Sequence, residues 1–552
     1  MLGMRTTAAA ALMLTCSGCF DPGEGVDPPL SRIYFPVGIA VSPANSRLYV
    51  ANSDFDLQFN GGSLQAFDLE RVRELTPVSC SSDGDCRDSQ RCDTAATPEN
   101  GGVPSFWCVA RSGDDAGKPC AGLGETTSAT QVLIPGRCGF LDPKRPPDGG
   151  TPLLLDAVGI GAFATDVLYR SRPDGPGGRL FIPVRGDSTL HYIDVVDDSE
   201  PEGVPFELEC GQSQSGGDCD DQHRRGDDPD EENTRGLRLS QEPFGIDGTV
   251  DGDALVLTHQ TEGAVSLFVN DGEAWGDGKN SFGVGPKLEF AVGGLPQRPI
   301  GIATIPEPRI VQETNVLYEP GFLVTFRDAA EVRLIRYFDD AASQPPRPFI
   351  QPSGGAAITV NSLGFDSRGI AIEHSQRDAC EASCPADAGD PRTGCLQQCA
   401  GVPLRVFVAN RSPSSLLIGQ TRPNQSPTSS DDLPQFFDTL PLPFGPSRVV
   451  VGNVIDKLGV VRPRVFVVCF DSRKIGIYDP DGRRLEKWIE TGRGPHAFAV
   501  DTRVDGTDAH ALAYVGHFTD SFVGVIDLDQ RSHTYGNMIL ALGRPTPPRA
   551  SK

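Results

Sequence analysis

Residues 36–69 read PVGIAVSPANSRLYVANSDFDLQFNGGSLQAFDL, and this stretch decides the fold. A short apolar run at 37–41 meets the turn Ser42-Pro43-Ala44-Asn45. A second run follows at 48–51 and, after a loop, a third at 64–69. Three β-rich runs divided by Pro, Asn and Gly predict a small antiparallel meander. The pattern returns along the chain, so we interpret the sequence as an array of repeats.

Six further units follow the same plan. Their middle runs begin at residues 179, 254, 321, 404, 464 and 511. Several units add a fourth run and end in a Gly- and Pro-rich junction, such as residues 441–446. Four strands, a tight junction and a new inner strand describe one blade of a β-propeller. The sequence therefore predicts an all-β, seven-bladed β-propeller over residues 33–545, with disulfide-rich loop insertions. The irregular second unit (161–195) leaves the count open by one blade.

Three units carry a family resemblance. RLYVAN (47–52), RVFVAN (405–410) and GPHAFAVDTR (494–503) resemble the YVTN-type β-propeller repeat. The resemblance implies the propeller fold and a scaffold that serves for binding. In relatives of this family the same scaffold supports lactone hydrolysis or other chemistry, so the resemblance leaves the function open.

Composition narrows the classes of function. The chain has 552 residues, with 49 basic against 74 acidic residues and a net charge of −25. An acidic surface repels phosphate backbones, so we expect no nucleic-acid partner. G-x-S-x-G, P-loop, dinucleotide, H-E-x-x-H and C-x-x-C-H patterns are absent from the sequence, and we predict neither a cofactor nor a metal site. We expect a monomer.

The first 19 residues, MLGMRTTAAAALMLTCSGC, have the pattern of an export signal. Arg5 precedes an apolar run at 8–14 that is too short to span a bilayer. Ser17 and Gly18 before Cys19 resemble the bacterial lipobox, although Cys16 stands where that family usually has Leu. The resemblance implies a signal peptide at 1–18, lipidation of Cys19, a tether at 19–32 and anchoring in the cell envelope, on the outer membrane. Ordinary cleavage is the alternative. Residues 546–552 form a tail.

Cysteines cluster between the repeats, and in an exported chain this predicts disulfides. Segment 79–140 is expected to be a stapled mini-domain, and 15 pairings of its six cysteines are possible. In segment 209–240, Cys210 and Cys219 are expected to close an acidic loop. The six cysteines of the first segment are Cys80, Cys86, Cys92, Cys108, Cys120 and Cys138.

Segment 376–402 holds a twin C-x3-C pattern formed by Cys380, Cys384, Cys395 and Cys399. Residues four apart share one face of a helix. The pattern therefore predicts two short antiparallel helices joined by two disulfides, with a Zn²⁺ site as the alternative. Cys469 lies inside the apolar run VFVVCF and is predicted to be a buried free thiol.

Candidate ligand-binding residues come from the loops that open onto one face of a propeller. These loops follow each second strand or join one blade to the next. They gather donor-rich side chains that suit a carboxylate, phosphate or carbonyl ligand. Capping of exposed turns is the alternative role for such residues. The candidates are Asn52, Arg185, His259, Arg327, Asn410, Arg411, Arg493, His496 and His517, with Arg298 and Phe470 beside them.

Three functions remain open. The first is a lipid-anchored extracytoplasmic scaffold that binds a protein or glycan partner. The second is an enzyme resembling lactone-hydrolysing propellers, which is favoured if Arg185, His259, Arg327 and His517 converge on one centre. The third is a structural envelope protein, which would show no concave site.

Overall fold

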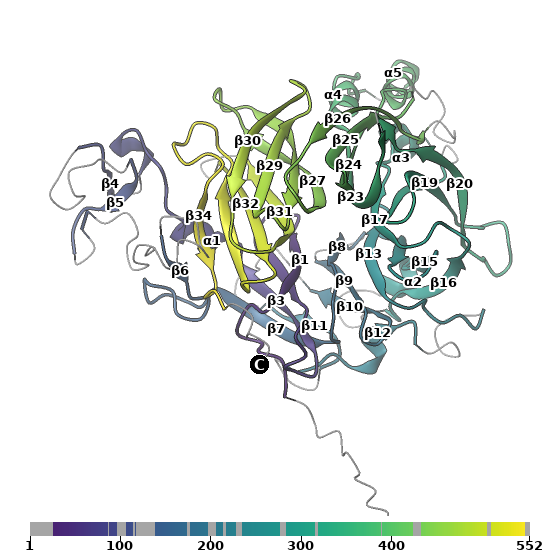
Figure 1. The fold of residues 1–552 in the computed structure, drawn as a ribbon, viewed down its shortest axis with the longest axis horizontal. Coiled ribbons are helices and arrows are strands. Elements are labelled where there is room, and N and C mark those ends of the chain that lie inside the picture. The colour runs from purple at the N-terminus through teal and green to yellow at the C-terminus, as the bar shows by residue number, and fades with distance from the viewer. Residues whose placement is uncertain are drawn as a thin grey trace, which may run out of the picture.

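The computed structural model describes residues 26–546 apart from 87, 96–105, 114–115, 118–137, 174–176, 197–205, 213–216, 228–234, 276–282, 315–317, 361, 388, 423–431 and 505–508. The predictions for residues 1–19 and for Cys120 concern positions outside these ranges. Within them the chain forms a ring of seven antiparallel blades, as the repeats predict (Figure 1). No helix of this described part is long and apolar enough to cross a bilayer.

Each blade is a sheet of consecutive strands, the innermost first. Blade 1 contains β1 (Pro36–Val41), β2 (Arg47–Asn52), β3 (Gly62–Asp68) and β7 (Leu154–Ile160). Blade 2 contains β8 (Leu168–Ser171), β9 (Gly178–Val184), β10 (Thr189–Val195), β11 (Leu208–Glu209) and β12 (Arg224–Arg225). Blade 3 contains β13 (Pro243–Gly248), β14 (Ala254–His259), β15 (Val265–Val269) and β16 (Lys287–Val292). Blade 4 contains β17 (Pro299–Thr304), β18 (Gly321–Phe326), β19 (Glu331–Phe338) and β20 (Phe349–Ala357).

The second half of the ring continues in the same order. Blade 5 contains β23 (Phe365–Glu373), β24 (Arg405–Ser412), β25 (Ser414–Gln420) and β26 (Gln435–Pro441). Blade 6 contains β27 (Pro446–Ile455), β28 (Val461–Cys469), β29 (Lys474–Asp479) and β30 (Arg484–Glu490). Blade 7 contains β31 (Pro495–Arg503), β32 (His510–His517), β33 (Phe522–Asp527) and β34 (Met538–Leu542).

Short elements lie in the connections. Two small hairpins pair β4 (Gln90–Cys92) with β5 (Cys108–Ala110), and β21 (Thr359–Val360) with β22 (Ser362–Leu363). The helices are α1 (Leu69–Leu75), α2 (Gly272–Trp275), α3 (Arg309–Glu313), α4 (Ser375–Ala382) and α5 (Asp390–Ala400), with single 3-10 turns at Asp83–Asp85 and Asp221–His223.

Blades 1 and 2 differ in detail from the sequence expectation. The fourth strand of blade 1, β7, follows the six-cysteine segment, so that segment is inserted within the blade. The inner strand of blade 2, β8, begins at Leu168, where the run 161–168 had been expected to supply it. Residues 162–165 still form backbone hydrogen bonds with residues 183–186 at the end of β9, and they lead into β8.

Glycine lets neighbouring blades touch backbone to backbone. The inner strands of blades 1, 3 and 4 begin P-x-G-I, and a register shift marks this point in each. A Cβ atom on Gly245 would stand 2.4 Å from the carbonyl oxygen of Ile300 in the next blade, and one on Gly38 would stand 2.6 Å from the amide nitrogen of Val167. Both distances are far below van der Waals contact, so only glycine fits.

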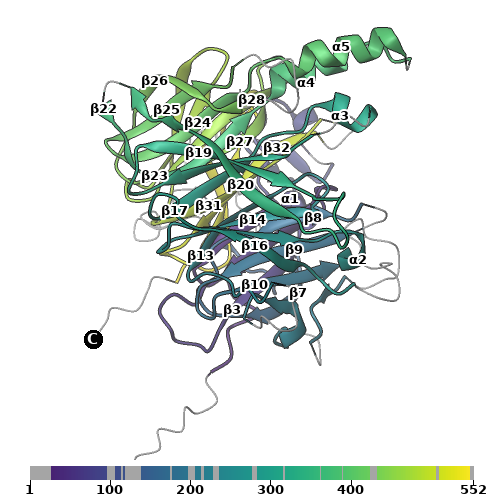
Figure 2. The ribbon, with the colours of Figure 1, turned by 90° about the vertical axis from the view of Figure 1, so that its right-hand side faces the viewer.

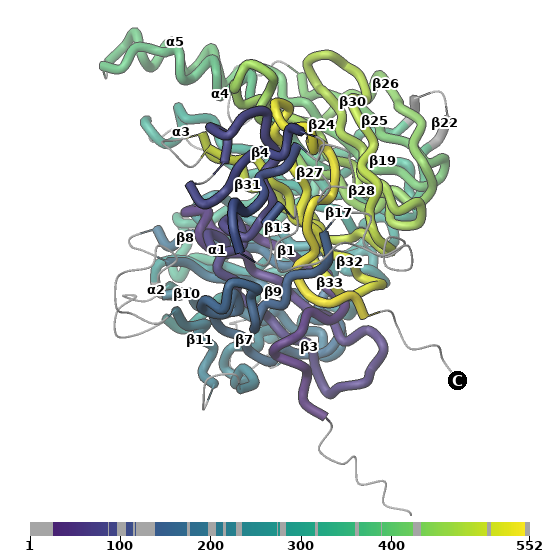
Figure 3. The backbone as a smooth tube through the Cα atoms, turned by 90° about the vertical axis from the view of Figure 1, so that its left-hand side faces the viewer, coloured from purple at the N-terminus to yellow at the C-terminus, as the bar shows by residue number. Residues whose placement is uncertain are grey.

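The ring closes without mixing its first and last blades. All four main strands of blade 7 come from the C-terminal end of the chain, and β1 packs beside β31 (Figure 1). A strap from the six-cysteine segment holds this junction, because β6 (Phe140–Leu141) adds to β34 as a parallel edge strand. The segment also contacts blade 7 at its start, where the Ser79 and Ser532 hydroxyl oxygens are 2.6 Å apart, while Figure 3 shows β4 in front of the ring on this side.

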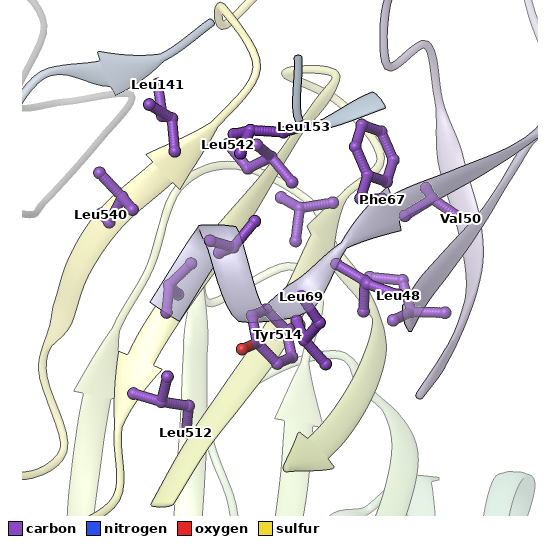
Figure 4. Close-up of a cluster of buried hydrophobic side chains, with 14 of the residues drawn as sticks. Leu48, Val50, Phe67, Leu69, Leu141, Leu153, Leu512, Tyr514, Leu540 and Leu542 are labelled. Atoms are coloured by element: carbon purple, nitrogen blue, oxygen red, sulfur yellow. The ribbon is translucent and has the colours of Figure 1, made fainter. Parts of the chain in front are cut away.

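A shared core lies beneath this strap. Leu48, Phe67 and Leu69 of blade 1 and α1 pack with Tyr514 and Leu542 of blade 7, and all five are fully buried (Figure 4). Leu141 and Leu153, from the strap and the strand it leads to, join the same cluster. Apolar burial at about 25 cal/mol per Å² therefore holds the closure in place of a shared blade.

A buried arginine near the start of β9 links two blades. In blade 2, Arg179 is fully buried and pairs across the strands with Asp194, its Nε and Nη2 donating to the two carboxylate oxygens at 2.8 and 2.9 Å. Its Nη1 reaches blade 3, donating to Asn270 Oδ1 at 2.7 Å and to the carbonyl of Ala274 at 3.0 Å. This arginine therefore ties two blades together.

The helical hairpin between β23 and β24 is confirmed. Helices α4 and α5 project from one edge of the ring (Figure 2) and are joined by the disulfides Cys380–Cys399 and Cys384–Cys395. The sulfurs of Cys384, Cys395 and Cys399 come close enough to hold a metal, but all four cysteines are consumed in disulfides. The disulfide interpretation is therefore confirmed.

The remaining described cysteines outside this hairpin are disulfide-bonded, except Cys469. Cys210–Cys219 is confirmed. In the six-cysteine segment the bonds Cys80–Cys92 and Cys86–Cys108 staple the β4–β5 hairpin, and Cys138 is disulfide-bonded as well. Cys469 is a buried free thiol, as expected, and burial raises its pKa to about 12.

Candidate functional site

Four of the predicted ligand-binding residues are structural. Asn52, His259, Asn410 and His517 end or nearly end the second strands of alternate blades, and all four are buried. Asn52, His259 and His517 each lie opposite the proline that begins the inner strand, and Asn410 lies opposite Ser367. Their side chains face the interior of their own blades, so they do not converge on a common centre.

The two asparagines fasten turns. Asn52 accepts from the backbone amide of Tyr34 at 3.0 Å and donates to Ser63 and Gln65. Asn410 donates to the carbonyl of Pro413 at 2.8 Å and accepts from Ser367. Both side-chain amides are thus occupied by their own blade, which is how buried polar groups are normally satisfied.

The two buried histidines are uncharged at neutral pH. His259 Nε2 lies 2.8 Å from Ser266 Oγ, and burial lowers its pKa to about 4. His517 Nε2 accepts from the amide of Gly492 at 3.0 Å, its ring stacks on Phe522, and burial lowers its pKa to about 3. Since both imidazoles are buried and bonded within a blade, neither is placed to take a proton from a bound molecule.

The arginines of this face are paired with carboxylates. Arg185 Nη2 is 2.7 Å from Glu242, Arg493 is 2.5 Å from Asp520, and Arg298 is 3.5 Å from Asp328. Arg411 pairs with Asp471. The predicted gathering of donors is therefore real, but each of these donors already has an acidic partner.

One corner keeps an excess of positive charge. Asp366 serves both Arg327, at 2.8 Å, and Arg368, at 2.5 Å, while Arg411 nearby has Asp471. Among the charged groups described here, three guanidinium groups face two carboxylates, which leaves one positive charge. Burial lowers the pKa of Arg368, and the charges of Arg327 and Arg411 add to that effect.

A pocket lined by aromatic rings opens on the same face. Its volume is about 150 Å³, and Phe55, Phe163, Phe244, Phe470 and Phe518 supply most of the wall. These residues come from the five consecutive blades 6, 7, 1, 2 and 3, four of them from loops or junctions and Phe244 from the start of β13. The remaining lining residues are Val37, Ser53, Ala164, Thr165, Arg185 and His496. A cavity of ~150 Å³ has room for one benzene ring.

The aromatic rings form a connected cluster. The Phe518 ring lies 5.0 Å from that of Phe35 and 5.1 Å from that of Phe55, and Phe55 meets Phe163 edge-on at 6.0 Å. Phe55 is half exposed, at 52%, although such a side chain is usually covered. The cluster therefore presents an apolar surface around the pocket.

His496 joins the aromatic half of the mouth to the charged half. Its ring contacts Phe470 and Phe518, and burial together with the nearby charges of Arg448 and Arg368 lowers its pKa to about 3. No residue in the described ranges makes a hydrogen bond to its ring nitrogens. His496 thus offers the pocket a neutral imidazole beside two guanidinium groups.

An ion pair crosses the ring beside the pocket. Arg448 of blade 6 reaches Asp166, in the junction before blade 2, at 2.5 Å. The two residues are 282 positions apart in sequence, so the contact joins distant parts of the ring. Asp166 follows Thr165 of the pocket wall, which places this pair at the edge of the pocket.

The sequence pointed to this face but not to the pocket. Arg185 and His496 were predicted, and both line it, with Phe470 named beside them. Phe55, Phe163, Phe244 and Phe518 were missed. The available signal was a phenylalanine in or next to these rim loops, in five of the seven blades, where polar turn residues are the rule.

No family model matches the chain, and no curated protein matches it. Solved structures match the chain at low identity and with TM-scores below 0.5. A putative 6-phosphogluconolactonase from Bacteroides fragilis is 12% identical over 84% of this chain and 86% of its own, with a TM-score of 0.40. A protein from Lactobacillus plantarum is 9% identical over 85% and 89% (TM-score 0.42), and Kuenenia stuttgartiensis hydrazine synthase is 10% identical over 90% and 96% (TM-score 0.42).

Proposed function

We propose that this protein is a lipid-anchored extracytoplasmic β-propeller of the cell envelope, on the outer membrane, that binds a partner protein at the aromatic mouth of the ring. The observation that carries the proposal is the aromatic pocket with half-exposed Phe55 at its rim. Partly exposed aromatic side chains around a pocket are typical anchors of protein interfaces.

The pocket supports the alternative functions less well than it supports protein binding. A structural envelope protein needs no concave site. A lactone-hydrolysing enzyme needs a general base, and His496, the histidine of this pocket, has a pKa of about 3. A glycan would need many hydrogen bonds, whereas Ser53, Thr165, Arg185 and His496 are the few polar side chains of the wall.

The extracytoplasmic location rests on the export signal and on the disulfides. Five disulfides join described cysteines. Disulfides of this kind persist in oxidising compartments and are rare in the cytosol. The lipid anchor rests on the lipobox-like sequence that ends at Cys19.

Replacing Cys19 with alanine is expected to abolish incorporation of labelled palmitate and to release the protein from the membrane fraction, because the acylated thiol is lost. The matched variant Cys16→Ala should keep both the label and the membrane association. A Cys19→Ala protein that still takes up label, or a mature wild-type chain beginning at another residue, would contradict the anchor.

Partner binding is tested with two exposed phenylalanines and a matched control. Phe444 is 80% exposed in the junction before blade 6, and its carbonyl accepts from Ser472 in the rim loop that carries Phe470. Leu458 is 85% exposed but lies in the turn between β27 and β28, which opens onto the opposite face. Phe444 and Leu458 thus lie on opposite faces of the ring but are almost equally exposed.

We expect Phe444→Ser and Phe55→Ser to reduce cross-linking to one identified envelope protein about tenfold or more, as loss of an interface anchor does. Quantitative mass spectrometry after cross-linking in intact cells measures this. Leu458→Ser should behave as the wild type. If the two phenylalanine variants and the control cross-link equally, the mouth is not the binding surface.

A further inference from the structure

The mouth of the ring has two chemically different halves. The aromatic half has space for one ring or a short branched alkyl group, with a pocket of about 150 Å³. The other half, in blades 4 to 6, holds Arg327, Arg368 and Arg411 against Asp366 and Asp471. A molecule that suits both halves must have an apolar group joined to an anion.

The balance of arginines and aspartates in this corner indicates how much negative charge the bound anion should carry. The protein as a whole carries −25, yet the described ion pairs of this corner join three guanidinium groups to the two carboxylates of Asp366 and Asp471. Arg327 and Arg368 share the single carboxylate of Asp366, so each has N–H donors left for a second acceptor. One carboxylate would balance the charge and accept bidentate hydrogen bonds from a guanidinium group.

His496 stands where the two halves meet. Its ring touches Phe470 and Phe518 on the aromatic side, and the charges of Arg368 and Arg448 reach it from the other side. As a neutral imidazole without a hydrogen bond among the described residues, it has one N–H to donate. A carboxylate placed against Arg368 would lie within the surroundings of this donor.

We propose that the mouth binds a monocarboxylate that carries a phenyl-sized apolar group, with the apolar group in the pocket of Phe55, Phe163 and Phe518 and the carboxylate against Arg368 and His496. The proposal deepens the proposed function, since it uses the same site. Two sources supply such a group: a free aromatic or branched acid, and the C-terminal apolar residue of a partner polypeptide.

The direct test compares an acid with its uncharged amide. Calorimetric titration of the full mature protein in detergent is expected to show binding of 3-phenylpropanoate, with 3-phenylpropanamide about tenfold weaker or more and acetate without measurable binding. Equal affinity for the acid and the amide would overturn the carboxylate site, as would the absence of binding by both.

Variants locate the carboxylate. Arg368→Gln, and independently Arg327→Gln, should bring the affinity for the acid down to that for the amide while leaving the amide unchanged. Arg484→Gln makes the same change of charge at a 74% exposed side chain on the β30 side of blade 6 and should alter neither affinity. If Arg484→Gln lowers the affinity for the acid as much as Arg368→Gln does, a general field effect replaces the proposed site.

Two peptides distinguish the sources. A hexapeptide ending in phenylalanine with a free carboxylate should bind better than its C-terminal amide if a polypeptide end is recognised, and preference for 3-phenylpropanoate over both peptides assigns the site to a free acid. The partner test separates this inference from the proposed function. Acid binding with undiminished cross-linking of Phe444→Ser overturns the function alone, and lost cross-linking with equal acid and amide affinity overturns the inference alone.

Discussion

Replacing Asp194 with alanine is expected to lower the free energy of unfolding by about 3–5 kcal/mol, because it leaves Arg179 charged and buried without its partner. Both residues are fully buried, and Arg179 also donates to Asn270 and to the carbonyl of Ala274 in the neighbouring blade. The guanidinium group further lies over the ring of Trp275, at 4.9 Å. Denaturant unfolding followed by circular dichroism measures the change.

Two controls separate the buried charge from the loss of a side chain. Asp148→Ala removes the partner of Arg71 on the surface, where the exposed fractions are 40% and 24%, and should cost less than about 1 kcal/mol. The double variant Arg179→Met/Asp194→Leu replaces the pair by apolar groups and should recover much of the lost stability. If Asp194→Ala lowers the free energy of unfolding no more than Asp148→Ala does, the Arg179–Asp194 pair does not hold blades 2 and 3 together.

Replacing Gly245 with alanine is expected to lower the free energy of unfolding by about 1–3 kcal/mol, the usual cost of overpacking a tight interior. The new Cβ atom would stand 2.4 Å from the carbonyl oxygen of Ile300, a backbone atom of the next blade that cannot move aside alone. Relief therefore requires blades 3 and 4 to separate slightly along the axis. Thermal and denaturant unfolding both report this loss.

A helical glycine supplies the matched control. Gly394 lies in α5, and a Cβ atom there meets nothing within 4 Å. Gly394→Ala should therefore leave the stability of the ring unchanged and favour the helical hairpin by about 0.5–1 kcal/mol, since alanine forms helices better than glycine. A Gly245→Ala protein as stable as the wild type would show that the inner strands do not touch as described.

The fold followed from the sequence because each blade repeats its turns and apolar runs. The tight junctions, such as residues 441–446, carry Gly and Pro in positions that only a turn explains. Blade 1 was predicted only in part. Its fourth strand, β7, is separated from β3 by 85 residues of insertion, and pairing across such a gap leaves no local signal.

The site followed less well because residue type indicates chemistry but not direction. His259 and His517 were named for their imidazoles, yet strand alternation and blade packing bury both against their own neighbours. The arginines were placed on the correct face, but their carboxylate partners come from other loops, as Glu242 does for Arg185. Such partners are brought together only by the ring, and no spacing in the sequence shows them.

The pairing of β6 with β34 of the last blade has a consequence for the order in which the ring forms. Synthesis of the chain runs from the N-terminus, so β6 and the flank of blade 1 are made long before β31 to β34. Until then, the blade 7 members of the shared core, such as Tyr514 and Leu542, are missing. We therefore expect a chain truncated before blade 7 to expose the apolar flank of blade 1 and to be degraded faster than the full chain.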